Sequence, residues 1–537
     1  MFKSEKQFDV LVIGSGLAGI HAAYPLVIAG KNVVMLDVGN DESHELESGP
    51  ADAFTEQRKK NPLQHEIFLG RDLSGMGVIH ANGGHVNFMT SGRRNYIQRN
   101  ADTKQPIQCT NATIIQTLAK GGLSEAWGGV CGIFNKEECN AVGLNYDEMK
   151  PHYAAIIKHI GVSGFHLNFQ LQEPASLDDN SSEILNCYIQ RKATFDRSEL
   201  QVSQPMLALL TQNIDSRLCT QYRDMDFWDN VGRSVYRGHY TLEELNTYNN
   251  FTYSNNILVT TVKETGNYVT VYAQNTYTNE ELFFSAKTLI LAAGAINTTR
   301  IVLKSFEQYT QPIPVILKNN YLIPCIQIKR LGKVTNIKRH SLCQLIVTST
   351  ATADISEDIH AQLYSYNSLL LFKLLSYIPL PIREALTFLS FISSAIILVD
   401  VRFHTPMNAQ SLASLEKNKS GDTYLKITHT ESVTQRKSAR AKLHKLKKAL
   451  FQLGLVPLTT ISNQPGSASH YAGGVPISTS QTHDRICTDT FGRLQNSKHI
   501  FIADSATWNA LPAKPPALSI MANAHRIGCH IRDTHIT

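Results

Sequence analysis

The stretch DVLVIGSGLAGIHAAYPLVIAGKNVVMLD, residues 9–37, decides the fold of this chain. Residues 10–13 form a short apolar run, which predicts a buried parallel strand. A G-x-G-x-x-G turn follows at residues 14–19, then a helical segment, and then a second apolar strand at residues 32–36. This strand ends at Asp37. Strand, glycine turn, helix, strand and acid in this order favour a dinucleotide-binding unit over a purely structural turn.

Each glycine of the turn has a predicted task. Gly14 permits the tight turn, Gly16 lets the backbone approach a pyrophosphate, and Gly19 lets helix and strand pack closely. The positive end of the helix dipole faces the phosphates. Asp37 lies 23 residues after Gly14, where it can accept hydrogen bonds from a ribose and would repel a 2′-phosphate, so FAD or NAD is favoured over NADP. The other turn residues expected to contact the dinucleotide are Ser15, Leu17 and Ala18.

The size and composition of the chain describe a globular protein of more than one domain. At 537 residues it exceeds one ordinary hydrophobic core. Hydrophobic residues make up 42% and charged residues 18%, and the formal net charge is +6. This charge is small for the size of the chain, so it gives no reason to expect a nucleic-acid partner.

The cysteines and the start of the chain bear on its location. The nine cysteines are scattered and include no C-x-x-C pair, which indicates free thiols in a reducing compartment. The first predicted strand begins near Phe8, which leaves no room for a signal or transit peptide. We therefore expect a cytoplasmic protein, or at most one that is peripheral at the inner face of a membrane.

Two segments after the first unit predict irregular structure, the first polar and the second rich in glycine. Residues 39–66 lack sustained periodicity and predict an irregular excursion, and residues 70–92 have the small residues of a loop or of backbone near a ligand. Residues 117–129, TLAKGGLSEAWGG, are either a surface loop or a loop that contacts a flavin or its phosphates, and we expect the second. The contacting residues would be Gly121, Gly122, Ser124 and Trp127.

A group of strands is predicted between residues 255 and 294. Alternating apolar residues over 255–287 predict a three-stranded meander. Residues 288–294 form a further buried strand that ends in the small residues Ala293 and Gly294, and a helix follows at about 297–303. Small residues at the end of such a strand let the backbone come close to a bound cofactor.

The middle of the chain, residues 311–435, has a residue pattern that differs from those of the two ends. Its apolar runs at 369–378 and 385–399 are each shorter than the roughly 20 residues needed to cross a bilayer. They predict a core helix followed by a strand, or alternatively an apolar lip resting on a membrane. The helix predicted over 434–453 carries many lysines and arginines on one face, which is either a solvated face or one that attracts anionic lipid or a phosphorylated substrate.

The last eighty residues carry the second set of signals. His470 stands in SASHYAGGVPI among small residues and is either structural or a catalytic base, and we expect the base. Residues 500–503 predict a short strand that ends at Asp504 and Ser505. Pro516 can begin the final helix, whose positive end would stabilise a flavin ring.

These motifs together resemble the glucose–methanol–choline (GMC) oxidoreductase family. The glycine turn, GGLSEAWGG, TLILAAGAINTTR, SHYAGG and FIADSATWNALPAKPPALSIMANAHRI occur in the order found in that family. The motifs cover both ends of the chain, whereas residues 311–435 match only in position. The GGLSEAWGG motif in a chain of this length is similar to bacterial GMC-type proteins associated with cell-surface polysaccharide synthesis.

The resemblance implies an α/β fold with two domains and a non-covalent FAD. A Rossmann-like FAD-binding domain with a parallel sheet and a β-meander would comprise residues 1–166, 206–310 and 479–537. A substrate domain with a mostly antiparallel sheet flanked by helices would comprise residues 311–478, with residues 167–205 crossing between the two. No histidine occurs in GGLSEAWGG, so the covalent histidyl-flavin of some relatives is not expected there.

The resemblance also implies roles for two residues. In the family, an active-site histidine accepts the substrate hydroxyl proton as hydride moves to flavin N5, and this histidine maps onto His470. A valine of the family's meander lies against the adenine, and Val262 looks like its counterpart. The family's second catalytic position, an asparagine or histidine, is occupied here by Pro515, whose side chain can neither donate nor accept. Lys514, Ser519 or Asn509 are candidates to replace it.

Three hypotheses follow for the function. The leading one is an FAD-dependent oxidoreductase, a dehydrogenase with an unknown electron acceptor, acting on a CH–OH group of a sugar or sugar-like alcohol with His470 as base. The second, motivated by Pro515, is a flavin-dependent isomerase without net redox chemistry. The third is a membrane-peripheral flavoprotein that uses residues 369–399 and lacks the alcohol-oxidising activity.

Overall fold

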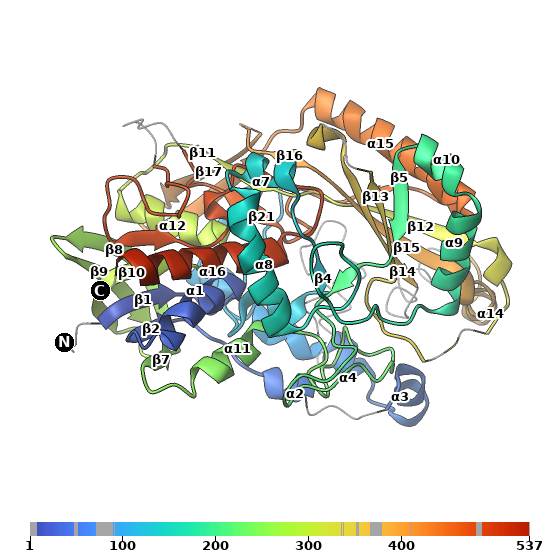
Figure 1. The fold of residues 1–537 in the computed structure, drawn as a ribbon, viewed down its shortest axis with the longest axis horizontal. Coiled ribbons are helices and arrows are strands. Elements are labelled where there is room, and N and C mark those ends of the chain that lie inside the picture. Colours follow the sequence, from blue (N-terminus) through green and yellow to red (C-terminus); the bar gives the residue numbers. More distant parts are fainter. Residues whose placement is uncertain are drawn as a thin grey trace.

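The computed structural model describes residues 8–47, 52–70, 90, 92–334, 336, 338–350, 354–365, 379–408, 410–478 and 486–535. Three larger sheets and their helices form two joined halves, with both chain ends on the half that holds β1 and α1 (Figure 1). One half has a largely parallel sheet and the other an antiparallel sheet. The predicted fold class, α/β with an FAD-binding domain and a substrate domain, is confirmed.

The first half is organised around a seven-stranded sheet. The predicted first strand is its central element, β1, and it pairs in parallel with β2 on one side and β10 on the other. Strand β7 extends the parallel part beyond β2, and β22 pairs with the end of β10. Val10, Leu11 and Val12 have no exposed surface, as the unbroken apolar run predicts. The strands are β1 (Phe8–Ile13), β2 (Val33–Leu36), β7 (Phe251–Ser254), β10 (Glu281–Leu291) and β22 (Ile500–Ile502).

The predicted three-stranded meander is present, but its third strand continues into the parallel sheet. Strands β8 (Ile257–Thr265) and β9 (Tyr268–Asn275) pair antiparallel, and β9 pairs with the first part of β10. The third meander strand and the buried strand at 288–291 are one continuous element, β10. ELFFSAKTLIL contains no glycine or proline that would end a strand, so β10 leaves the meander and enters the parallel sheet without a turn.

Helices from both ends of the chain cover one face of this sheet. Helix α1 (Leu17–Ile28) packs against the last helix, α16 (Ala517–Thr534), and α16 packs against α8 (Tyr146–Ile160), as Figure 1 shows. A Cβ at Gly528 of α16 would lie 2.2 Å from the Ala22 carbonyl oxygen of α1, so these two helices touch backbone to backbone. Helix α16 is longer than predicted.

The second half contains an antiparallel sheet in the order β19-β12-β15-β14-β13-β5, with β20 beside β12. The predicted basic helix is α15 (Val433–Gln452), which packs Leu443, Leu446 and Leu450 onto this sheet. Residues 167–205 supply α9 (Asp179–Gln190), α10 (Lys192–Arg197) and β5 to the same half. The strands are β5 (Leu200–Ser203), β12 (Tyr321–Gln327), β13 (Leu345–Ser349), β14 (Ile359–Ser365), β15 (Ile396–Phe403), β19 (Leu455–Pro457) and β20 (Ile461–Ser462).

A five-stranded sheet joins the halves. Its order is β21-β11-β17-β18-β3, so it combines β3 (Ile107–Thr110) with strands from the later part of the chain. Strand β21 (Tyr471–Gly473) directly follows His470 and thereby fixes its backbone. The other strands are β11 (Ile313–Leu317), β17 (Ser411–Lys417) and β18 (Thr423–His429). Two small pairs complete the inventory, β4 (Val130–Cys131) with β6 (Met206–Leu207), and β16 (Thr405–Pro406) with β23 (Ala510–Leu511).

Several helices differ from the sequence-based expectation. The described part of residues 39–66 is not irregular: it contains α2 (Ser43–Glu47), α3 (Phe54–Lys60) and the start of α4 (His65–Leu69). A helix and a strand were expected within 385–399; α14 (Ile382–Ile392) is that helix, but it buries only Ala385 and Leu389 and is therefore no core helix. The apolar run at 369–378 and most of the glycine-rich stretch at 70–92 lie outside the described residues. The other α-helices are α6 (Ala101–Lys104), α7 (Lys136–Val142), α11 (Gly238–Leu245) and α12 (Ala295–Ser305).

Two further observations concern the chain as a whole. All nine cysteines are free thiols, and five of them are buried. Within the described ranges, no helix combines the length and the apolar character needed to cross a bilayer.

Candidate functional site

A cavity of about 940 Å³ lies between the two halves. Its lining runs from the glycine turn and the ends of β10 and β22, past the start of α16, to strands β12, β14 and β15. The volume is at the upper end of the roughly 300–1,000 Å³ that small-molecule sites occupy. The cavity therefore has room for an extended ligand that reaches from one half of the molecule into the other.

Most of the residues predicted from the sequence meet at this cavity. Three do not line it: Gly19, Gly121 and Val262. Those that do are Gly14, Ser15, Gly16, Leu17, Ala18, Asp37, Gly122, Ser124, Trp127, Ala293, Gly294, His470, Asp504, Ser505 and Pro516.

The glycine turn has the geometry that its spacing predicts. Gly14 has φ +97°, a left-handed conformation that favours glycine, and a Cβ there would lie 2.6 Å from the Ala292 carbonyl oxygen. A Cβ at Gly19 would lie 1.9 Å from the Gly14 carbonyl oxygen. Gly19 therefore acts from behind the turn, by permitting helix and turn to touch, which explains why it does not line the cavity.

The second glycine motif packs directly against the first. A Cβ at Gly122 would lie 3.0 Å from the Gly16 Cα, so the two backbones are in contact. The Gly121 N–H donates to Ser15 Oγ at 3.0 Å, and the Ser15 hydroxyl donates in turn to the Asp37 carboxylate. Segments about 100 residues apart in sequence thus form one wall of the cavity.

Asp37 is placed to receive a ribose. Its carboxylate accepts hydrogen bonds from Ser15 and from the Tyr253 hydroxyl, the latter at 3.3 Å. Burial raises the pKa of Asp37 to about 6, against the opposing effect of these hydrogen bonds. A carboxylate with so little solvation gains from further donors, and the hydroxyls of a ribose are such donors.

A second buried carboxylate, Asp504, holds the ends of two parallel strands together. It accepts the Gly294 N–H at 2.9 Å and the Thr298 hydroxyl at 2.5 Å, and its other oxygen accepts the Ala506 N–H at 2.9 Å. Burial raises the pKa of Asp504 to about 6. A Cβ at Gly294 would meet nothing within 4 Å, so the backbone here faces open space in the cavity. This is the close approach that the small residues after β10 predicted.

The polar side chains of Ser124 and Trp127 in GGLSEAWGG form hydrogen bonds within the protein. The Ser124 hydroxyl donates to the Gly121 carbonyl at 2.7 Å and accepts the Gly238 N–H at 2.8 Å. The Trp127 indole N–H donates to the Tyr236 carbonyl at 2.7 Å. Both residues therefore shape the wall of the cavity, and their polar atoms are already used.

The sequence analysis missed a group of charged residues that includes Glu125 of this loop. Glu125, fully buried, accepts from His239 at 2.9 Å, and the other ring nitrogen of His239 lies 2.9 Å from Glu47. Burial works against the charged imidazole, but the two carboxylates outweigh it and raise the pKa of His239 to about 9. The three partners come from distant segments, so no local pattern could have revealed them.

Val262 lies in the hydrophobic core beside the meander, and its N–H donates to Ser305 Oγ at 2.9 Å. The valine of β8 that reaches the cavity is Val259. The pairing of β8 with β9 shifts register between Val259 and Thr261. This bulge breaks the alternation of the strand, so simple counting along it does not identify the side chain that faces the cavity.

His470 lines the same cavity as the glycine turn and stands directly before strand β21. Its Nδ1 is buried and has no hydrogen-bond partner among the described residues. Burial holds the pKa of His470 well below its ordinary value, and the nearby charges of Arg402 and Lys318 lower it further. The imidazole is therefore neutral and able to accept a proton.

Polar side chains from the antiparallel sheet line the same cavity. Arg402 pairs with Asp400 at 2.5 Å, and Asp400 also accepts from the Asn320 amide at 2.9 Å. The Arg402 Nε is buried and finds no partner among the residues that the structure describes. Polar residues that line the cavity from this sheet and the segments next to it include Asn320, Gln362, Tyr364, Asp400, Arg402 and Asn463.

Pro515 lines the cavity, and none of its three proposed substitutes does. Lys514 points away and pairs with Glu138 at 2.7 Å. The Ser519 hydroxyl is hydrogen-bonded to Tyr153 at 2.6 Å, and the Asn509 amide donates to the Ile477 carbonyl at 3.0 Å. A charged group that acts on His470 and lines the cavity is Arg402, from a segment in which the sequence analysis found no motif.

Comparisons with known proteins agree with this geometry. Residues 9–59 match the family described as an FAD binding domain. The cofactor is FAD. A similar solved structure is the crystal structure of pyridoxine 4-oxidase from Mesorbium loti, with a TM-score of 0.59 and 14% identity over 98% of this chain and 100% of that one. No curated protein matches the chain significantly. The chain thus has the fold of an FAD-dependent oxidoreductase, and the described residues fit the cofactor.

Proposed function

We propose that this chain is a GMC-type oxidoreductase that oxidises a CH–OH group of a sugar or sugar-like alcohol, with His470 as the base. The observation that carries the proposal is the position of His470: a neutral imidazole with a free Nδ1, in the same cavity as the glycine turn. Bound FAD supplies the acceptor for the hydride.

The chain's own residues perform the proton chemistry. His470 takes the proton of the substrate hydroxyl, because a neutral buried imidazole is a base that its surroundings do not protonate at neutral pH. The negative charge that develops on the substrate oxygen is stabilised by Arg402, whose charge already acts on His470. Arg402 thus takes the supporting role that the side chain at Pro515 cannot perform.

The substrate class follows from the polar set at this end of the cavity. Amide, hydroxyl, carboxylate and guanidinium groups together can donate to and accept from several hydroxyls at once. A hydrocarbon alcohol would leave them unpaired, which is costly in a buried site. A polyhydroxylated substrate fits them, in keeping with the resemblance to proteins of cell-surface polysaccharide synthesis.

The test is anaerobic reduction of the bound flavin by a panel of sugars and sugar alcohols. We expect the purified protein to be yellow and at least one panel member to bleach it. The variant His470→Ala should retain FAD and bleach about 10²–10⁴-fold more slowly. His444→Ala, an exposed histidine of α15, is the matched control and should bleach at the wild-type rate. An undiminished rate in His470→Ala would exclude the proposed base.

Two finer points belong to the same proposal. The FAD is non-covalent, so heat or acid should release it from the precipitated protein. The enzyme is a dehydrogenase, so an artificial dye should reoxidise the flavin faster than oxygen does. Rapid reoxidation by oxygen, with peroxide formed, would instead identify an oxidase.

Pro515 at the cavity wall favours one alternative, a flavin-dependent isomerase without net oxidation. Product formed without an electron acceptor, in amounts exceeding the enzyme, would support it. A strict requirement for the acceptor would exclude it.

Helix α14 supports the proposal of a membrane-peripheral location. It exposes Ile382, Leu386, Phe388 and Phe391, each by 46% or more. Flotation with vesicles containing anionic lipid tests whether this helix binds a membrane. Loss of flotation in Phe388→Ser/Phe391→Ser would support the contact, and a wild-type protein that does not float would exclude it.

A further inference from the structure

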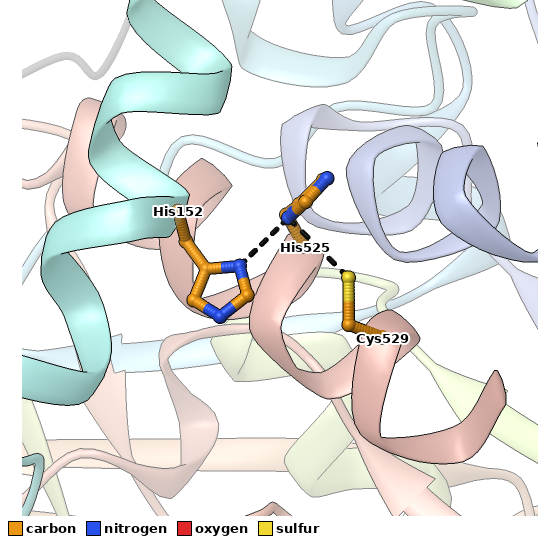
Figure 2. A group of neighbouring side chains, drawn as sticks. All are labelled: His152, His525 and Cys529. Atoms are coloured by element: carbon orange, nitrogen blue, oxygen red, sulfur yellow. Dashed lines mark hydrogen bonds between the residues drawn. The ribbon is translucent and has the colours of Figure 1, made fainter. Parts of the chain in front are cut away.

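A second group of chemically reactive side chains lies outside the cavity. His152 on α8 faces His525 and Cys529 on α16, as Figure 2 shows. His525 and Cys529 are four residues apart, so they occupy the same face of α16 one turn from each other. None of the three lines the cavity.

The three potential ligand atoms are close together. The Nδ1 atoms of His152 and His525 are 2.8 Å apart, and the Cys529 Sγ is 3.7 Å from the His525 Nδ1. All three atoms lie within 4.8 Å of one another. Ligand atoms around a tetrahedral zinc ion are about 3.3 Å apart for two nitrogens and about 3.6 Å apart for nitrogen and sulfur, given the usual bond lengths. To admit the ion, the two nitrogens must move apart by about half an ångström. The His152 ligand atom and Cys529 Sγ, which lie within 4.8 Å of each other, must come to about 3.6 Å.

We propose that His152, His525 and Cys529 form a binding site for Zn²⁺ that joins α8 to α16. Imidazole nitrogen and thiolate sulfur are both ligand types that zinc binds, and three protein ligands leave a fourth position for water. All three side chains are partly exposed, so the ion can enter from solvent. Among the described residues no fourth histidine, cysteine or acid joins the group.

The charges around the cluster allow a cation to bind. Arg526 and Arg532 are the nearest cations, but Arg526 pairs with Glu148 at 3.1 Å and Arg532 with Asp533 at 2.6 Å. A metal ion binds the neutral form of an imidazole and the thiolate form of a cysteine. Burial raises the pKa of Cys529, and coordination overcomes this by removing the thiol proton.

A metal ion at this site would hold α16 to α8. This helix begins at Pro516 and Ala517 on the cavity wall, and the cluster fixes it further along its length to α8. An ion that binds the folded chain and not the unfolded one stabilises the fold in proportion to its concentration. Zinc should therefore raise the melting temperature without changing the cavity.

The experiment uses the full-length, untagged, FAD-loaded protein after treatment with a chelator. Titration with ZnCl₂ against a chromophoric chelator should give one equivalent of tightly bound zinc and a higher melting temperature. His152→Ala, His525→Ala and Cys529→Ser should each bind zinc at least tenfold more weakly. His530→Ala, on the same helix but stacked on Phe491, and Cys187→Ser are the controls and should bind as the wild type does.

A second measurement needs no variant. Bound zinc should slow the alkylation of Cys529 by iodoacetamide, followed by mass spectrometry of its peptide, and leave Cys187 unaffected. Unchanged alkylation of Cys529, or equal zinc affinity in Cys529→Ser and the wild type, would overturn the proposal. So would an absence of saturable binding at micromolar zinc.

Discussion

At the nucleotide end of the cavity the wall is mostly backbone, whereas at the substrate end it is mostly side chain. Gly14, Gly16 and Gly122 bring main chains into contact, and a Cβ at Gly122 would press on Gly16. At the other end, Arg402, Asp400 and their neighbours project from the strands of an antiparallel sheet.

The two ends also differ in how burial shifts the pKa values of their titratable groups. The two acids of the nucleotide end, Asp37 and Asp504, have raised pKa values because they are buried away from any cation. The histidine of the substrate end has a lowered pKa because it is buried and because cations lie near it. One end thus favours hydrogen-bond donors, and the other holds the imidazole that the proposed reaction uses as its base.

The largest expected effect on catalysis is that of Arg402→Gln, which removes a cation from the substrate end of the cavity. We expect kcat/KM to fall about 10²-fold because the developing oxyanion loses its stabilising charge. The pKa of His470 should rise, since a positive neighbour is gone, so the acidic limb of the pH profile moves to higher pH. FAD affinity should not change.

Arg440→Gln, on the exposed face of α15, is the control for Arg402→Gln and should keep wild-type kinetics. An Arg402→Gln enzyme with an unchanged pH profile would show that Arg402 does not act on the base. Steady-state kinetics over a pH series, with the FAD content of each variant, measures both parts.

A matched pair of glycine variants tests the nucleotide end. In Gly19→Ala the new methyl would lie 1.9 Å from a backbone oxygen, so the fold should lose at least the roughly 1–3 kcal/mol typical of overpacking. In Gly16→Ala the nearest atom is 4.0 Å away, so the apoprotein should keep its stability and only FAD affinity should fall. Denaturant unfolding of the apoproteins and FAD titration separate the two. Equal loss of stability in both would contradict this division of roles.

The smallest expected effect is on the pH dependence of FAD binding. A carboxylate with a pKa of about 6 loses its charge as the pH falls through 6, and FAD affinity should fall with it. Asp37→Asn should bind FAD about tenfold more weakly at pH 7.5, the loss expected for one hydrogen bond to a charged group. It should also show a flatter pH dependence below 7.

Asp9→Asn is the control for Asp37→Asn, because Asp9 pairs with Lys287 outside the cavity. Fluorescence titration of the apoproteins with FAD between pH 5 and 8 gives both quantities. A pH dependence as steep in Asp37→Asn as in the wild type would assign the titration to Asp504 instead.

The same contrast explains what could be predicted from the sequence. At the nucleotide end the backbone contacts demand particular residue types at fixed spacings, so Gly14, Gly16 and Asp37 were recognisable. The later motifs around Gly294 and Asp504 were recognisable for the same reason, and the structure brings them to one cavity.

The substrate end offered no such constraint. Arg402 and Asp400 are ordinary polar residues in an apolar strand, and only the folded sheet brings them near His470. The valine facing the cavity was missed because a bulge in β8 shifts the alternation between Val259 and Thr261. The partners of Glu125 were missed because ion pairs between distant segments leave no local pattern.

The pairing of β1 with β10 and of β10 with β22 has a consequence for how the protein is made. The glycine turn and Asp37 leave the ribosome before Asp504 and Pro516, which line the same cavity and follow only after more than 460 further residues. At ~5–20 residues per second this interval is roughly half a minute to a minute and a half. The cavity for FAD is thus complete only after Pro516 has been synthesised.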